Sequence, residues 1–154
     1  MKMEPNEFLP AESLIPHRRG MRLIEWVKNP TPDALQAETV VTERWPLQAD
    51  GMVSSLIGME LVAQTVSALS TWRRGKGAGP KIGLVVGIKE AEFLRPRVPV
   101  GTRLTIQIHK LYQIGDYAVV QGEVRSDSAL ICKIILQVME PEAELLEASK
   151  AGGR

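Results

Sequence analysis

The sequence predicts an α+β domain in which an antiparallel sheet wraps one long central helix. We expect this helix over residues 54–74, where apolar side chains cover most of the circumference, as in a helix buried inside a fold. Strand-like patterns occur on both sides of it, joined by turn chemistry that suits hairpins. Since helices do not alternate with these strands, a doubly wound parallel sheet is excluded.

The composition is that of one globular domain. The chain has 154 residues, of which 44% are hydrophobic and 24% charged. Its net charge of +1 gives no reason to expect nucleic acid or an anionic membrane as a partner. Cys132 is the single cysteine, which excludes an internal disulfide. The chain has only two histidines, His17 and His109, so we expect no metal site and no redox cofactor.

No segment predicts export or membrane insertion. The first residues lack the apolar core of a signal peptide, so we expect a cytoplasmic protein. The apolar stretch 54–74 is long enough to span a bilayer, but Glu60 and Gln64 lie in its middle, where polar groups are costly in lipid. We therefore interpret it as a buried helix.

The chain before the helix is expected to form a hairpin, with a loop on each side of it. Residues 1–10 are predicted to be a flexible lead, and Pro, Gly and Arg mark a loop at 16–20. The remaining predicted elements are a short helical turn at 11–15, strands at 21–27 and 35–41, a turn at 29–33, and an aperiodic loop at 42–53.

The central helix has clear start and stop signals. Ser54 or Ser55 is expected to cap its start. Arg73 and Arg74, followed by glycines and a proline, end it, because cations suit the carbonyl end of the helix dipole. Its polar residues recur at helical spacing and predict one narrow stripe, made of Glu60, Gln64, Ser67 and Thr71.

The second half of the chain predicts an antiparallel meander. We expect strands at 82–93, 104–109, 117–125 and 129–138, with turns between them. Cys132 falls on the apolar face of the last strand, which predicts a buried thiol, and His109 falls on a polar face, which predicts a solvated side chain. The charged tail at 140–154 is expected to fray, which leaves 11–139 as the folded domain.

A single curved sheet around one helix leaves its back and one edge uncovered. Pairing two such sheets is the usual way to protect both. We therefore predict a homodimer or a higher assembly, with a heterodimer with a related chain as the alternative.

Two motifs carry a resemblance to a known family. Residues 15–18 read Ile-Pro-His-Arg, residues 21–24 read Met-Arg-Leu-Ile, and residues 58–64 read Gly-Met-Glu-Leu-Val-Ala-Gln. Together they resemble the hotdog-fold 3-hydroxyacyl-[acyl carrier protein] dehydratases, and most closely the branch associated with aryl polyene biosynthesis. The similarity extends from about residue 14 to about residue 138. It implies a dimeric hotdog fold.

The resemblance implies a reaction and roles for particular residues. Members of the family remove water from a 3-hydroxyacyl thioester to give the trans-2-enoyl thioester, without a cofactor. Glu60 would be the acid that protonates the leaving hydroxyl, in apolar surroundings that keep its carboxyl neutral. The start of the helix would bind the thioester carbonyl through backbone donors, with Gln64 as an orienting residue. The substrate-binding residues so predicted are Ser55, Leu56, Ile57, Gly58 and Gln64.

The catalytic base departs from the family pattern. Better-known dehydratases of this fold carry a His-Phe-Pro-Gly segment in the loop before the helix, whereas residues 43–51 contain no histidine. His17 is the replacement that we predict, and Asp50 is a weaker candidate. The thioester would be delivered on an acidic acyl carrier protein or on coenzyme A. Basic residues in three loops are predicted to contact the carrier, and Arg18, Arg19, Arg73 and Arg74 are the candidates that we name. The same loops also hold Lys76, Lys81, Arg95 and Arg97.

Two other functions remain open from the sequence. A catalytically silent hotdog subunit could bind an acyl chain or complete a heterodimer with an active relative, and the missing loop histidine favours it. An acyl thioesterase on the same fold could use Glu60 alone to activate water or attack the acyl group.

Overall fold

The computed structural model describes residues 7–75, 83–127 and 129–140. The helix α1 spans Gly58–Arg74 and is preceded by the 3-10 turn η3, Ser55–Ile57. The elements before them are β1 (Leu9–Pro10), η1 (Ala11–Ser13), η2 (Arg19–Met21), β2 (Trp26–Thr31), β3 (Ala34–Val40), β4 (Gln48–Ala49) and β5 (Met52–Ser54). Those after them are β6 (Leu84–Phe93), β7 (Arg97–Pro99), β8 (Arg103–Ile114), β9 (Tyr117–Ser126) and β10 (Ala129–Met139).

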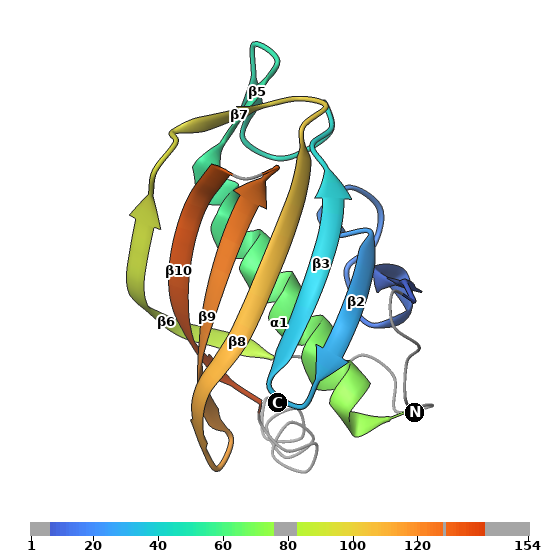
Figure 1. The fold of residues 1–154 in the computed structure, drawn as a ribbon, viewed down its shortest axis with the longest axis vertical. Helices are drawn as coiled ribbons and strands as arrows, with labels where there is room; N and C mark the ends of the chain where they lie inside the picture. The colour runs from blue at the N-terminus through green and yellow to red at the C-terminus, as the bar shows by residue number, and fades with distance from the viewer. Residues whose placement is uncertain (1–6, 76–82, 128, 141–154) are drawn as a thin grey trace, which may run out of the picture.

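The main sheet has seven antiparallel strands in the order β1-β2-β3-β8-β9-β10-β6. Strands β8, β9 and β10 form a meander as predicted, but β6, the first strand of the predicted meander, pairs with β10 instead of β8. Its place beside β8 is taken by β3, which pairs with β8 across the intervening helix. Figure 1 shows α1 behind this sheet and β6 at its far edge. The predicted antiparallel sheet around one helix is therefore confirmed.

Close contact between α1 and the sheet depends on two glycines. A Cβ on Gly58 would meet Sγ of Cys132 in β10, and a Cβ on Gly122 in β9 would meet the side chain of Val62. Cys132 itself is fully buried, as predicted. Hydrogen in place of a side chain at these two positions lets the helix lie close to the strands.

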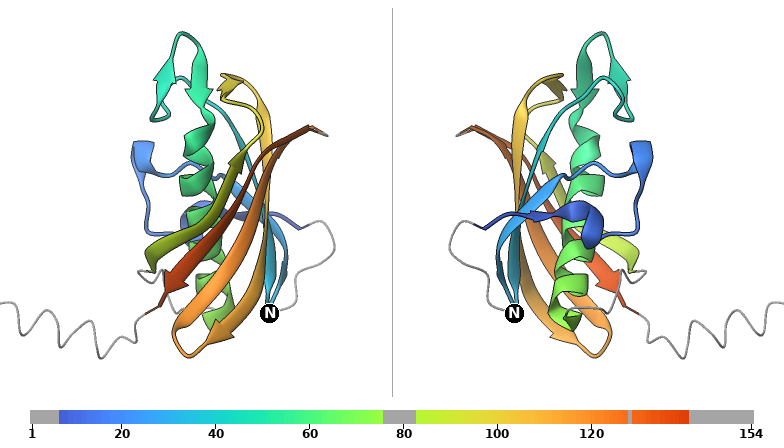
Figure 2. Two further views of the ribbon diagram at one scale, coloured as in Figure 1. Left: turned by 90° about the vertical axis from the view of Figure 1, so that its left-hand side faces the viewer. Right: turned by 90° about the vertical axis from the view of Figure 1, so that its right-hand side faces the viewer.

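The N-terminal segment covers the other side of the helix. Figure 2 shows it crossing the face of α1 that points away from the sheet. Ile15 and Ile24 are its fully buried anchors in the core. The helix is therefore enclosed by the sheet on one side and by this segment on the other.

Three predicted elements before the helix are wrong in part. The predicted strand 21–27 begins only at Trp26, because the side chain of Gln64 in α1 binds the backbone of Met21, Leu23 and Ile24. The predicted turn at 29–33 lies partly inside β2, where Asn29 has a φ of 54° and the register shifts between Lys28 and Thr31. The predicted loop at 42–53 contains β4 and β5, which form a second sheet with β7.

The ends of the chain were predicted only in part. Leu9 and Pro10 pair with β2, so they belong to the sheet rather than to a flexible lead. Residues 1–6 and 141–154 lie outside the described residues, as do Lys76 and Lys81. Within the described ranges, no helix combines the length and apolarity needed to cross a membrane.

Strand β6 is an exposed apolar edge. Four of its side chains are about half exposed, namely Leu84, Val85, Val86 and Ile88. Helix α1 packs mainly on β2, β3, β8, β9 and β10, which leaves this strand largely uncovered. An edge with free backbone groups and apolar side chains is a surface that another chain can pair with.

Candidate active site

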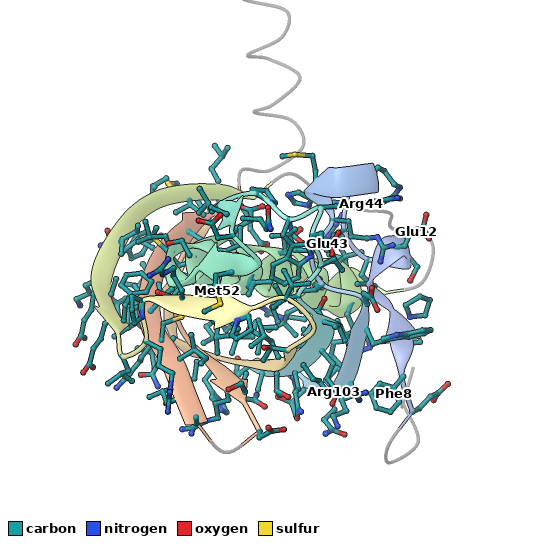
Figure 3. All side chains as sticks on the ribbon, turned by 90° about the horizontal axis from the view of Figure 1, so that it is seen from above. Phe8, Glu12, Glu43, Arg44, Met52 and Arg103 are labelled. Carbon is teal, nitrogen blue, oxygen red and sulfur yellow. The ribbon has the colours of Figure 1, made fainter. Side chains whose placement is uncertain are left out.

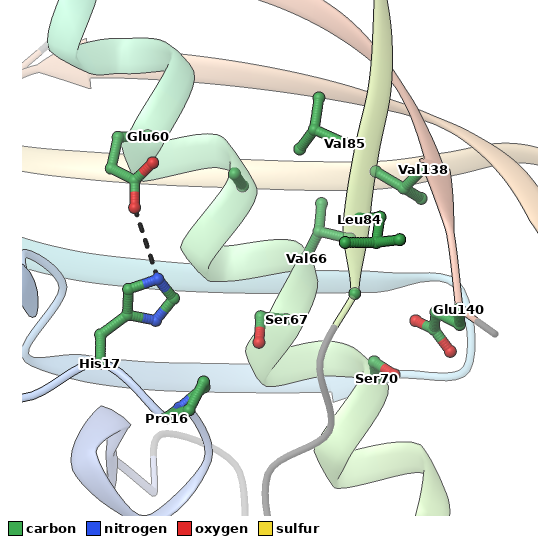
Figure 4. A pocket seen from close by; sticks show the side chains of 12 residues that line it. Pro16, His17, Glu60, Val66, Ser67, Ser70, Leu84, Val85, Val138 and Glu140 are labelled. Carbon is green, nitrogen blue, oxygen red and sulfur yellow. Dashed lines mark ion pairs between the residues drawn. The ribbon is translucent and has the colours of Figure 1, made fainter. Parts of the chain in front are cut away.

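A cavity of about 260 Å³ lies between α1, β6 and the end of β10. Glu60, Ala63, Ser67 and Ser70 line its helical wall, and Val85 lies opposite them. Figure 4 shows Glu60 and His17 at one end of this cavity and Glu140 near the other. Most of the lining is apolar, which suits an acyl chain.

His17 and Glu60 meet at the mouth of this cavity. Nε2 of His17 lies 3.5 Å from Oε1 of Glu60, as the dashed line in Figure 4 marks. Their side chains are 28% and 44% exposed, so both can be reached from solvent. The exposure of Glu60 differs from our expectation of apolar surroundings, because the carboxyl lies at the open end of the cavity. The structure does bring the two predicted catalytic residues together.

Arg18 shapes the loop that carries His17. Its guanidinium donates hydrogen bonds to the carbonyl oxygens of Ile15 at 2.6 Å and His17 at 2.8 Å. Charged donors of this kind hold a turn firmly. Nε2 of His17 is the nitrogen that faces Glu60. Nδ1 is buried and has no hydrogen-bond partner among the described residues.

Gln64 ties the N-terminal segment to the helix. Its amide nitrogen donates to the carbonyl of Met21 at 2.7 Å and to Oε1 of Glu60 at 3.0 Å. Its amide oxygen accepts from the backbone N–H groups of Leu23 at 2.9 Å and Ile24 at 3.4 Å. The side chain is fully buried, so these contacts position Glu60 and the loop before it.

The predicted substrate-binding residues lie beside the cavity and do not line it. These are Ser55, Leu56, Ile57, Gly58 and Gln64. The N–H of Ser55 donates to the carbonyl of Pro96 at 2.9 Å, and that of Leu56 donates to Oγ of Ser54 at 3.3 Å. Ser54, one of the two predicted caps, caps the 3-10 turn η3 that precedes α1. It uses the N–H of Leu56, which is one of the donors predicted to bind the thioester.

The predicted carrier-binding arginines are spread over the molecule. Arg73 and Arg74 end α1, and Arg73 donates to Oε1 of Gln113 at 3.5 Å. Thirteen residues separate Arg73 from Glu60, which is about 20 Å along the helix axis. The side chain of Arg19 lies outside the described part of the chain.

Sequence reasoning missed Ala63 and Ser70 as cavity residues. They share a helical face with Glu60 and Ser67, because the spacing 60, 63, 67, 70 follows the helical repeat. The stripe that we predicted instead ran through Gln64 and Thr71, which are both buried. The missed signal was the small size of Ala63 and Ser70, which leaves room beside the helix.

Two predictions about residues outside this cavity, His109 and Cys132, are confirmed. His109 is exposed, as predicted. Burial raises the pKa of the Cys132 thiol to about 11, which keeps it protonated and unreactive. In the part of the chain that the structure describes, no group of three His, Cys, Asp or Glu side chains could hold a metal ion.

Comparison with known proteins gives one family and several similar folds. The model of the ApeP-like family, described as ApeP dehydratase, matches residues 9–150. A chain of the dehydratase heterocomplex ApeI:P from Xenorhabdus doucetiae is 22% identical, with a TM-score of 0.79 over 92% of this chain and 97% of that one. No curated protein sequence matches the chain.

Other solved structures are more distant. A putative thioesterase related to phenylacetic acid degradation, from Ralstonia eutropha, is 18% identical with a TM-score of 0.59, over 73% of this chain and 82% of that one. A hypothetical thioesterase with coenzyme A, from Streptococcus pneumoniae, is 14% identical with a TM-score of 0.59, over 73% and 85% of the two chains. At these identities the likeness shows a shared fold, the hotdog fold that we predicted.

Proposed function

The chain belongs to the ApeP-like dehydratase family, and we propose that it removes water from 3-hydroxyacyl thioesters to give trans-2-enoyl thioesters. The observation that carries this proposal is the pairing of His17 with Glu60 at the mouth of an apolar cavity. An elimination of this kind needs one group to take a proton and another to give one, and both must reach adjacent carbons of the substrate. Two titratable side chains 3.5 Å apart meet that need.

The proposed reaction assigns one role to each side chain. Nε2 of His17 takes the proton from the carbon beside the thioester carbonyl, and the electrons of that bond form the new double bond. The hydroxyl leaves from the next carbon as water, with a proton from Glu60. His17 then returns a proton to Glu60 across the 3.5 Å between them, which resets the site.

The hydrogen bond from Gln64 distinguishes the two oxygens of Glu60. Oε1 already accepts from Nε2 of Gln64, so Oε2 is the oxygen that we assign to the substrate hydroxyl. An acyl chain that fills the cavity displaces water from around Glu60. The substrate hydroxyl then has no competing water for the proton that Glu60 donates.

We propose an acyl carrier protein as the carrier and a second hotdog subunit as the partner. The exposed apolar side chains of β6 support pairing at this edge. The partner can be a second copy, or a related chain as in the ApeI:P heterocomplex from Xenorhabdus doucetiae. Pairing at β6 would also cover the side of the cavity that Leu84 and Val85 line.

A catalytically silent subunit is the second candidate. The loop at 43–51 lacks the histidine found in better-known dehydratases of this fold, and the Xenorhabdus relative occurs in a heterocomplex. In that case the chain would complete the fold of an active partner, and its own His17–Glu60 pair would not turn over substrate.

Absorbance of the enoyl thioester tests the proposed function. Wild type is mixed with a 3-hydroxyacyl carrier-protein substrate, beside the variants His17→Ala and Glu60→Gln and the control His109→Ala, which changes an exposed histidine. We expect product from wild type and the control, and a loss of at least about a hundredfold in both site variants. Activity that survives His17→Ala would show that another group is the base. An inert, folded wild type would favour the silent subunit, and release of free thiol would indicate a thioesterase.

A further inference from the structure

A second surface feature lies at the end of the molecule where α1 begins. A groove of about 490 Å³ runs between β7 and the turn from β9 to β10. Arg95 and Arg97 line it, together with the hydroxyl side chains of Thr102 and Ser126 and the carboxylate of Asp127. Both arginines are exposed, and no ion pair between described residues involves either of them. Their guanidinium groups are thus available to an anionic ligand.

The groove is joined directly to the start of the helix that carries Glu60. Arg97 lies opposite Ser54 in the pairing of β7 with β5, and the carbonyl of Pro96 accepts the N–H of Ser55. Figure 1 shows β5 and β7 above the first turn of α1, and Figure 3 shows Met52, another lining residue, at this end of the molecule. From Ser54 to Glu60 the chain advances by about 10 Å along the helix axis.

The other arginines are less suited to the same ligand. Arg18 already donates to two carbonyls of its own loop, and Arg73 lies at the far end of α1 beside Gln113. Arg95 and Arg97 are therefore the two described arginines of the predicted basic loops that combine exposure with a position near Glu60.

A thioester substrate brings a suitable anion. Whether its acyl group is carried by a protein or by coenzyme A, the thiol ends a pantetheine arm that carries a phosphate at its other end. That arm, when extended, is longer than the distance from Ser54 to Glu60. Guanidinium groups bind phosphate oxygens through paired hydrogen bonds, and the two hydroxyls can donate as well.

We propose that the Arg95–Arg97 groove binds the phosphate of the phosphopantetheine arm while the acyl group enters the cavity beside Glu60. This assignment rests on the proposed function, since it names the group that delivers the substrate. Asp127 weakens the site by repulsion, because its carboxylate lines the same groove.

Direct binding tests the groove without catalysis. Coenzyme A, a phosphopantetheinylated acyl carrier protein and the same carrier without its arm are titrated into wild type and into the double variant Arg95→Glu/Arg97→Glu. Charge reversal should weaken binding of coenzyme A, of the armed carrier, or of both by at least about tenfold, and the bare carrier should bind more weakly than the armed one. Binding of only one of the two armed ligands identifies the source of the phosphate.

Matched variants distinguish binding in this groove from a general effect of the protein's net charge. Arg44→Glu/Arg103→Glu makes the same change in net charge at exposed arginines outside the groove, and it should leave binding within about twofold. Asp127→Asn removes the repelling charge, and asparagine also tolerates the left-handed backbone found there, with a φ of 46°, so binding should tighten. Equal weakening by both double variants, or no binding of either armed ligand to wild type, would overturn the proposal.

A thioester substrate without phosphate tests the proposed dehydration independently of the proposed phosphate site. Turnover of a 3-hydroxyacyl N-acetylcysteamine thioester should be the same in wild type and in Arg95→Glu/Arg97→Glu, whereas KM for the carrier-bound substrate should rise at least about tenfold. An unchanged KM for the carrier-bound substrate would overturn the proposed phosphate site but not the proposed function. A wild type that converts neither substrate would contradict the proposed function, while the titrations would still decide the groove.

Discussion

Gln64 donates a hydrogen bond from Nε2 to Oε1 of Glu60 across 3.0 Å, from one turn further along α1. The direction of this bond is fixed, because the amide oxygen of Gln64 accepts from the backbone N–H groups of Leu23 and Ile24. The same side chain therefore holds the loop that bears His17 and sets which oxygen of Glu60 remains free.

Replacement of Gln64 by leucine should cost both stability and activity. Gln64→Leu leaves the buried N–H groups of Leu23 and Ile24 and the part-buried carbonyl of Met21 without this partner, so we expect the free energy of unfolding to fall by about 2–4 kcal/mol. Urea denaturation measures this change. The control Gln107→Leu removes a partly buried glutamine whose amide donates only to two backbone carbonyls, and it should cost about 1 kcal/mol. Equal losses would show that Gln64 has no special positioning role.

Alanine at Gly58 should destabilise the protein through Cys132. An added Cβ would meet Sγ of Cys132, so Gly58→Ala should lower the free energy of unfolding by about 1–3 kcal/mol, although alanine favours helices. Cys132→Ala removes that sulfur, and the double variant should recover part of the loss. Gly20→Ala, at a site with open space, is the control. Additive losses in the double variant would contradict the proposed contact.

The buried thiol should make stability fall at alkaline pH. Burial raises the pKa of Cys132 from 9.0 to about 11, so between these values the unfolded chain loses a proton that the folded chain keeps. The unfolded state is favoured in that window, and the loss for this group reaches roughly 3 kcal/mol above it. Urea denaturation at pH 8 and pH 10.5 should show a steeper fall for wild type than for Cys132→Val. An equal fall in the free energy of unfolding for the two proteins would show that the thiol does not contribute to the pH dependence.

A charge on β6 should prevent subunit pairing. Ile88 is 49% exposed on this strand, and Ile88→Lys would place an ammonium group in the proposed interface. Sedimentation should show that the dissociation constant of the assembly rises by more than about tenfold. Leu47→Lys makes the same kind of change at another exposed side chain, outside the main sheet, and should leave the assembly intact. Dissociation by both variants would argue against β6 as the interface.

A larger side chain at Ser70 should shorten the acyl chains that the protein accepts. Ser70 lines the cavity ten residues after Glu60, which is about 15 Å along α1. Ser70→Trp should lower kcat/KM for long 3-hydroxyacyl thioesters by at least about tenfold and have a smaller effect on four-carbon substrates. Ser70→Ala keeps the space and should behave like wild type. An equal effect on both chain lengths would place the acyl group elsewhere.

Local pattern was sufficient for most of the fold. The helical segment at 54–74, which is the 3-10 turn η3 followed by α1, follows from its nearly continuous apolar surface. Residue type narrowed its cap to Ser54 or Ser55, and the structure shows Ser54. The hairpins from β8 to β10 follow from alternation and turn residues that lie within one short stretch. Leu104, Ile106 and Ile108 alternate with polar residues in this stretch, and all three are buried.

The predictions that were wrong or incomplete concern contacts between distant parts of the chain. Residues 21–24 look like part of a strand, but the amide of Gln64 binds the backbone of Met21, Leu23 and Ile24. The N–H of Ser55 looks free at a helix start, but it donates to Pro96, which follows β6. Neither partner can be inferred from the residues around the position itself, because the chain must fold to bring them together.

The sequence by itself determined the buried helix and the hairpins of the antiparallel sheet, since periodicity and turn chemistry are local properties, and its resemblance to a known family pointed to His17 and Glu60 as candidates. Only the tertiary structure decided that these two side chains meet, that Gln64 holds one of them, and that Ala63 and Ser70 leave a cavity along the helix. Distances between residues far apart in the chain depend on how the sheet curves around α1 and on where two glycines let it approach, and no single stretch of sequence specifies that geometry.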